Sequence, residues 1–191
     1  MKNKYVEKAF QKNKNIKKKK DINWIIKITI AAFLITIVMS LIAESALNNV
    51  SIFISIIIML IFIFLGIIFD MIGIAVTVAD KKVFNSMAAK KVKGAKTGIK
   101  LMKNSNKVAS FCNDVIGDIC GILSGSAAST IALLVTDSLG INIFISTLLI
   151  TSIIAALTIG GKAWGKSIAI NNANNILYEF SKFICIFKKE K

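Results

Sequence analysis

The stretch from Val108 to Thr136, VASFCNDVIGDICGILSGSAASTIALLVT, is long and apolar enough to cross a bilayer. It nevertheless carries two carboxylates, Asp114 and Asp118, which lie four residues apart. A carboxylate that faces lipid costs about 2.5–3.5 kcal/mol on insertion scales, so we expect this side of the helix to face protein or a cavity. An alternative stays open, above all for Asp114, because an acid near the membrane interface can simply cap the start of a helix.

Small residues follow the carboxylates at regular spacing, with Gly117, Gly121 and Gly125 at every fourth position. On an α-helix the two carboxylates share one face with Gly121 and Gly125, because residues three and four apart are neighbours. Glycines on such a face let another helix backbone approach closely in a membrane. The stretch therefore predicts a packed polar site inside the membrane, with the three glycines as the surface for helix packing and dimerisation.

The composition is that of a membrane protein. Of the 191 residues 55% are hydrophobic, and the mean hydropathy is +0.70, which a soluble domain of this size does not need. Histidine is absent, which excludes histidine-based metal sites and histidine-dependent triads. Since no phosphate-binding loop is present either, we expect no enzyme. The three cysteines lie scattered in apolar surroundings, which predicts small hydrophobic side chains without a disulfide framework.

Lysine supplies all 25 basic residues, and the net charge is +15. The lysines form blocks in the N-terminal tail, in residues 81–107 and in residues 162–191. Because the blocks flank apolar segments on alternate sides, they follow the positive-inside pattern, which argues against nucleic acid as the partner. We predict four spans in a bacterial cell membrane, with both termini cytoplasmic and short outer turns at 44–50 and 137–142. The bacterial assignment rests on the Lys, Ile and Asn bias, which is typical of AT-rich genomes.

The pattern as a whole predicts an all-α integral membrane protein. Residues 1–22 form a basic cytoplasmic tail that can bind anionic headgroups. Residues 23–50 form an extra N-terminal span with its outer turn, retained although the preceding lysines resemble a signal peptide. A transmembrane domain at 51–187 follows, with spans at about 51–79, 108–136 and 143–160, a basic amphipathic juxtamembrane helix at 80–107 along the membrane surface, and a C-terminal amphipathic helix at 166–187.

A third acid, Asp70, lies late in the second span, between Gly66 and Gly73. Glycines around an intramembrane acid favour a local break or close packing. The alternative is that Asp70 already reaches the cytoplasmic headgroups. In the fourth span, three glycines between positions 160 and 165 interrupt the apolar pattern and predict that the span ends there.

Five short motifs occur in a fixed order: Ala-Val-Thr leading to Lys-Gly-Ala, then Ser-Asn-Lys, Ile-Gly-Asp, Gly-Lys-Ala-Trp-Gly-Lys and Asn-Asn-Ala-Asn. They lie at Ala75–Ala95, Ser105–Lys107, Ile116–Asp118, Gly161–Lys166 and Asn171–Asn174. In order and spacing they resemble the ALTS box with its juxtamembrane helix, the NP turn, and the IGN, GEIxPK and RNAE motifs. These belong to the DUF21-type transmembrane domain of the CNNM/CorC (CorB) magnesium transporter family. The resemblance covers about residues 67–187.

The resemblance implies a magnesium ion held inside the membrane by Ser and Asn side chains and backbone carbonyls. The family's first-helix Ser falls on Asp70, and the Asn of its IGN motif falls on Asp118. With Asp114 and Gly117 beside them, these are the expected metal-binding residues. Since Mg²⁺ prefers hard oxygen ligands, Asp in place of Ser and Asn would strengthen the attraction to a divalent cation.

Three positions depart from the family pattern. A second Asn ligand falls on Ile122, the Glu of GEIxPK on Lys162, and the Pro on Gly165. Lys162 adds a positive charge that opposes cation binding. We also expect the family's CBS-domain pair to be absent, so that nucleotide regulation would require a separate regulatory chain.

Two functions follow from these residues. The first is a divalent-cation transporter, or the cation-binding transmembrane domain of one, that works as a homodimer and rearranges its spans around Asp70 and Asp118. The second is a transport-inactive membrane interaction or assembly protein, in which Asp70, Asp118 and Lys162 form an internal ion pair. A holin-like pore is a third hypothesis, against which the intramembrane aspartates argue.

Overall fold

The computed structural model describes residues 2–47 and 51–187, and every regular element in these ranges is helical. Within them, four helices are long and apolar enough to cross a membrane: Ile22–Leu47, Ile52–Val78, Ser105–Leu139 and Ile143–Asn171. The expectation of an all-helical chain with four potential spans is confirmed. The chain thus has the build of a multi-pass membrane protein.

The chain divides into two compact units. The first is the part of helix α1 (Lys2–Leu47) that ends at Met39, and the second begins at Ser40. From residue 22 to the end of the first unit, large apolar side chains are exposed along the helix, as expected of a surface that faces lipid. They are Ile22, Ile25, Ile26, Ile30, Phe33, Leu34, Ile37 and Val38.

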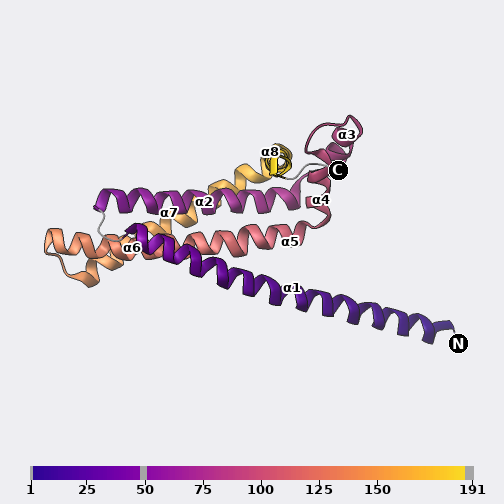
Figure 1. Cartoon of the computed structure of the whole chain (residues 1–191), viewed down its shortest axis with the longest axis horizontal. Helices are drawn as coiled ribbons and strands as arrows, with labels where there is room; N and C mark the ends of the chain where they lie inside the picture. Colours follow the sequence, from indigo (N-terminus) through magenta and orange to yellow (C-terminus); the bar gives the residue numbers. More distant parts are fainter. Residues whose placement is uncertain (1, 48–50, 188–191) are drawn as a thin grey trace. The chain divides into compact units, whose positions relative to one another are not determined.

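Three long helices form the body of the second unit: α2 (Ile52–Val78), α6 (Asp118–Leu139) and α7 (Ile143–Asn171). They lie side by side (Figure 1). Small residues of α6 let branched side chains of α2 pack closely against it, which gives one dry core. Its buried members are Leu47, Met59, Ile63, Ala127, Ala128, Ile131 and Ile154.

The turn between α6 and α7 is encoded locally. Gly140 ends α6 in the left-handed region, with φ of 65°, which glycine adopts without steric cost. The Asn142 side chain then accepts a hydrogen bond of 2.8 Å from the backbone N–H of Phe144 and caps the start of α7. The predicted outer turn at 137–142 is therefore shorter, because α6 continues to Leu139.

Residues 80–107 do not form the single juxtamembrane helix that the sequence predicts. They form α3 (Lys81–Ala89) and α4 (Ala95–Lys103), which pack against each other. The chain turns between them through two residues with positive φ, Lys91 at 57° and Gly94 at 91°. Glycine adopts a positive φ at no steric cost. The turn therefore interrupts the helix, although the apolar periodicity of residues 80–107 continues through the turn.

A second core lies at this end of the unit, where α3 and α4 meet α2 and α8 (Ala173–Phe187). The ring of Phe84 is fully buried against Gly98 of α4. The backbone N–H of Asp80 donates a hydrogen bond of 2.8 Å to Oδ1 of Asn174, which ties the end of α2 to α8. The buried members of this core are Ile72, Val76, Phe84, Met102, Cys112 and Leu177.

The fourth span does not end at its glycines. Helix α7 runs on to Asn171, and α8 begins at Ala173, so the predicted boundaries of 160 and 166 are wrong. The reason is packing, because Gly161 and Gly165 lie against the side chains of Ile67 and Met71 on α2. Glycine here permits close helix contact and does not break the helix.

We expect Gly165→Ala to lower stability by about 1 kcal/mol and Gly160→Ala to leave it unchanged or slightly raised. A Cβ at position 165 would lie 2.9 Å from Cγ2 of Ile67, whereas a Cβ at position 160 has nothing within 4 Å. Thermal unfolding in detergent measures both. Equal losses at the two positions would mean that the glycines do not act through packing on α2.

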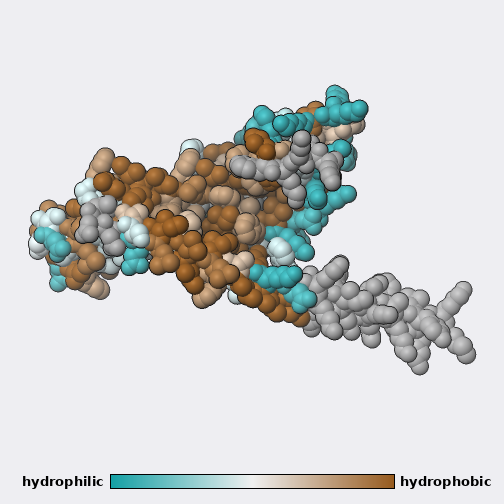
Figure 2. Space-filling model, viewed as in Figure 1, coloured by the Kyte–Doolittle hydropathy of each residue, from teal (hydrophilic) through white to brown (hydrophobic). Residues whose placement is uncertain are grey.

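Charge gathers at one end of the second unit. Helices α3, α4 and α8 lie at the same end of the α2–α6–α7 bundle (Figure 1). The backbone of Lys182 on α8 lies against Gly94, so the two lysine-rich segments meet there. Figure 2 shows hydrophilic surface over α3 and α4 and a hydrophobic band along the bundle. This is the distribution that the positive-inside pattern predicts for these two lysine blocks.

Candidate functional site

The third potential span is not a single α-helix. Helix α5 (Ser105–Ser110) leads into a π-helical segment, η1 (Phe111–Gly117), and α6 follows without a break. Short π-helical segments within α-helices are frequently found at functional sites. The stretch FCNDVIG that forms η1 contains Asn113, Asp114 and Gly117. This segment was not predicted from the sequence, because α-helical spacing was assumed throughout the span.

The π-helical segment changes where the carboxylates lie. Asp114 and Asp118 are both exposed in the single chain, so neither is buried in protein, and a cavity beside them stays a prediction. The π-helical spacing shifts Asp114 relative to this face, whereas Asp118, Gly121 and Gly125 keep the α-helical spacing of α6. Gly117, by contrast, is buried.

Residues from three helices nevertheless meet beside η1. The carboxyl of Asp70 on α2 is half-buried, and four charged side chains act on it electrostatically: Lys162 most strongly, then Lys166, Asp118 and Asp114. The Nζ of Lys162 lies 3.8 Å from the position that a Cβ on Gly117 would take. Charged side chains of η1, α6 and α7 therefore lie within electrostatic range of Asp70 on α2.

These groups lie at a common depth. Each of the three long helices has one end far from the lysine-rich end of the bundle. At a rise of 1.5 Å per residue from that end, Asp70 on α2, Asp118 on α6 and Lys162 on α7 lie about 27–32 Å along their helices. This is close to the thickness of about 30 Å of a hydrocarbon core. Helices that began at one edge of such a core would therefore place the site near the other edge, at the lysine-rich end, and not at the bilayer midplane.

The groups are close but not in direct contact. Over residues 2–47 and 51–187, no group of three or more His, Cys, Asp or Glu side chains could hold a metal ion. Within the same ranges no salt bridge joins Lys162 to Asp70 or to Asp118. Neither the complete metal site nor the direct ion pair that the sequence suggests is formed in this arrangement. What is formed is a mixed cluster of three acids and two lysines.

Two members of the site were not foreseen. Lys166 lies one turn beyond Lys162 on α7 and acts on Asp70. Asn113 of η1 has a buried side-chain oxygen that finds no hydrogen-bond partner among the described residues, and this side chain is pressed against Gly73 of α2. An Asn inside an apolar span opposite a glycine is the signal that could have identified it.

The glycine spacing has a different role from the one expected. The close approach of α6 to α2 is made at Gly66, where a Cβ would lie 3.2 Å from Cβ of Cys120. A Cβ at Gly121 or Gly125 would have nothing within 4 Å, and these two glycines line an open groove of about 290 Å³ between α6 and α7. Only Gly117 of the three lies beside the charged cluster. Their role in a dimer stays a prediction.

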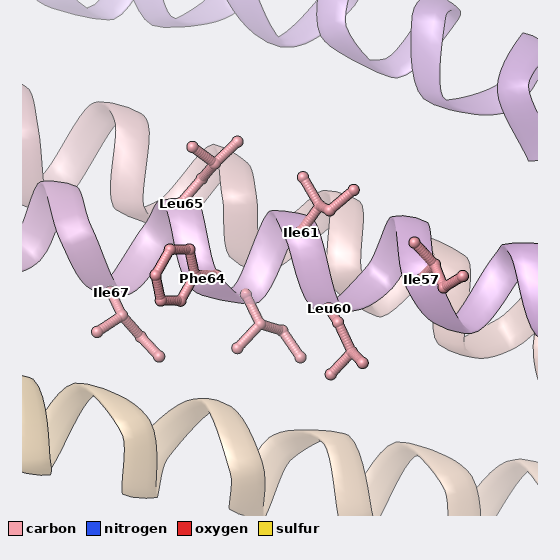
Figure 3. A pocket seen from close by; sticks show the side chains of 7 residues that line it. Ile57, Leu60, Ile61, Phe64, Leu65 and Ile67 are labelled. Carbon is pink, nitrogen blue, oxygen red and sulfur yellow. The ribbon is translucent and has the colours of Figure 1, made fainter.

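A second hollow, of about 500 Å³, lies on the surface of α2. Its side chains are all apolar, as Figure 3 shows, and they project from successive turns of this helix. Such a surface matches lipid and offers no group for binding an ion. Its lining residues are Ile57, Leu60, Ile61, Ile63, Phe64, Leu65 and Ile67.

No family model, curated protein or solved structure matches the chain. The function is therefore inferred from the residues of the site alone.

Proposed function

We propose that the chain binds a cation, and specifically a divalent cation such as Mg²⁺, at the acidic cluster formed by Asp70, Asp114 and Asp118. In this proposal it carries the ion across a bacterial cell membrane in the manner of a CorC/CorB-type transporter. The supporting observation is that three helical segments bring carboxylates to one level of the spans, beside a π-helical segment. An ionisable group within a potential span is by default a candidate for a functional site, such as an ion pathway.

To bind a cation, the carboxylates of Asp70, Asp114 and Asp118 have to move closer together. Mg²⁺ takes oxygen ligands in octahedral geometry and keeps several waters, so few protein ligands are needed. The π-helical turn supplies the freedom, because its conversion to α-helix rotates the segment that carries Asp114 relative to Asp118. Lys162 has the role of a tethered cation, which attracts the Asp70 carboxylate in the resting protein and is displaced when the ion enters.

The remaining features follow from sequence rules. We take the lysine-rich end to face the cytoplasm, with both termini on that side. The chain works as a homodimer, for which the open groove beside Gly121 and Gly125 offers a surface of small residues. Regulation by nucleotide requires a separate chain.

The test is thermal unfolding of the purified chain in detergent across a Mg²⁺ titration. A native-state site stabilises by about 2.7 kcal/mol at a hundred times its Kd, which corresponds to a rise in Tm of roughly 5–10 °C. We expect this saturable rise in the wild type and its loss in Asp118→Asn. Asp137→Asn is the matched control, because Asp137 is an exposed acid on the same helix at its opposite end. A flat response in the wild type would reject the proposal.

A second candidate function is supported by the position of Lys162. This lysine is the strongest charge acting on Asp70, which suits a protein that has kept an internal counter-ion and serves in membrane assembly without transport. In that case Asp70→Asn lowers the Tm equally with and without Mg²⁺, and Lys162→Met partly restores it. The same titration therefore separates the two functions.

A further inference from the structure

The segment from residue 79 to residue 107 displays an excess of positive charge. All nine of its lysines are exposed. The acid of this segment, Asp80, uses its carboxylate to accept a hydrogen bond of 2.8 Å from the backbone N–H of Lys82, as the cap of α3. The nearby acid on α8, Glu179, pairs at 3.7 Å with Lys182 of the same helix. The nine lysines are at positions 81, 82, 90, 91, 93, 96, 100, 103 and 107.

Helix α4 arranges three of these lysines in a row. Lys96, Lys100 and Lys103 follow one another at i, i+4 and i+7, so they share one face of the helix. The row is about 10 Å long at 1.5 Å per residue. Among the described residues no salt bridge is formed by any of the three lysines. The row therefore presents three uncompensated ammonium groups.

The opposite face of α4 is covered by protein. Its Ala95, Gly98 and Met102 are buried, against α3 and α8. The sequence pattern alone predicts that such a helix inserts its apolar face into the bilayer. Since that face is already used inside the fold, the contact of α4 with a membrane has to be electrostatic and made by the lysines.

The position of α4 in the chain determines which surface its three lysines face. Only Asn104 separates α4 from Ser105, where the third potential span begins, and α2 ends at Val78, shortly before α3. The three lysines are therefore held at the face of the bilayer where α2 ends and the third potential span begins. The anions concentrated at that surface are the phosphates of acidic phospholipids, which attract basic segments that lie next to spans.

We infer that Lys96, Lys100 and Lys103 form a binding site for the headgroup phosphates of anionic phospholipids. The charge of the row complements the lipid, and the buried face of α4 holds the three ammonium groups in place. This inference does not depend on cation transport, and it assigns a lipid partner to a surface away from the acidic cluster. It also predicts that lipid binding weakens with salt, since exposed charges are screened.

The test uses the full chain in uncharged detergent, titrated with dioleoyl-phosphatidylglycerol or dioleoyl-phosphatidylcholine. We expect a saturable rise in Tm with the anionic lipid alone, which declines as NaCl is raised from about 0.05 to about 0.5 M. In K96Q/K100Q/K103Q the apparent affinity for phosphatidylglycerol falls roughly 100-fold. Since the three side chains are exposed, the Tm without lipid stays near that of the wild type.

The matched control is K90Q/K91Q/K93Q, which removes the same charge from the turn between α3 and α4. We expect it to retain most of the affinity. Equal losses in the two triple variants would assign the effect to net charge and overturn the site, as would an equal response to phosphatidylcholine. A single-stranded oligonucleotide that stabilises the wild type as strongly, at equal phosphate concentration, would overturn the assignment to lipid.

Discussion

Gly98→Val is expected to destabilise the second unit by about 3 kcal/mol, at the upper end of the cost of overpacking a core. A Cβ at this position would overlap the ring of Phe84, which is fully buried, and would lie 3.1 Å from Oγ of Ser181. The ring cannot move aside, because α2, α3, α4 and α8 pack around it. Thermal unfolding monitored by circular dichroism in detergent gives the loss as a lower Tm.

Two further variants separate packing from helix propensity. Gly125→Val places the same residue in the open groove of α6, where a Cβ has nothing within 4 Å, and should cost far less. Combining Gly98→Val with Phe84→Leu shortens the obstructing side chain and should recover part of the loss. An undiminished loss in the double variant would show that the ring of Phe84 is not the cause.

Gly73→Val is expected to be as costly and to disturb η1 as well. A Cβ on Gly73 would overlap the side chain of Asn113, so the π-helical segment would have to move away from α2. We expect a loss of about 3 kcal/mol. Because η1 carries Asp114, the same variant should also abolish any stabilisation by Mg²⁺, which one titration measures together with the Tm.

The partner variant Asn113→Ala tests the mechanism. Within residues 2–47 and 51–187 the Asn113 oxygen has no hydrogen-bond partner, so its removal should cost less than about 1 kcal/mol. It should also make Gly73→Ala tolerable, which gives a favourable coupling energy in a double-mutant cycle. If Asn113→Ala alone lowered the Tm as much as Gly73→Val, the side chain would be a structural support and not an obstruction.

Much of the fold could be predicted because its signals are local. The helix α2 is encoded by its own Ile-rich run. The turn between α6 and α7 is encoded by Gly140 and Asn142, which lie within it. The distribution of lysines alone predicts that two of the lysine blocks lie at the same end of the helix bundle. The amphipathic pattern of α4 was also visible in the sequence. The apolar face of such a helix can pack against lipid or against protein, and only the contacts of α4 with α8 decide between the two.

The site could be predicted as a set of residues but not as a geometry. Asp70 and Asp118 were recognised because charges are costly in apolar segments, and Lys162 through the motif resemblance. Their proximity depends on α7 running on through Gly161, which in turn depends on the packing of α7 against Ile67. The π-helical turn depends likewise on hydrogen bonds and packing along the whole span, which spacing does not report.

The depth of the charged cluster has an electrical consequence. Most of a membrane potential falls across the hydrocarbon core, and moving one elementary charge through it is worth about 2.3 kcal/mol per 100 mV. A divalent ion that reached Asp70 and Asp118 from the lysine-poor end would cross nearly the whole field, at about twice that energy. From the lysine-rich end it would cross almost none. If the cluster binds the ion, its occupancy should thus depend on voltage for ions that arrive from the lysine-poor end and hardly at all for ions from the lysine-rich end.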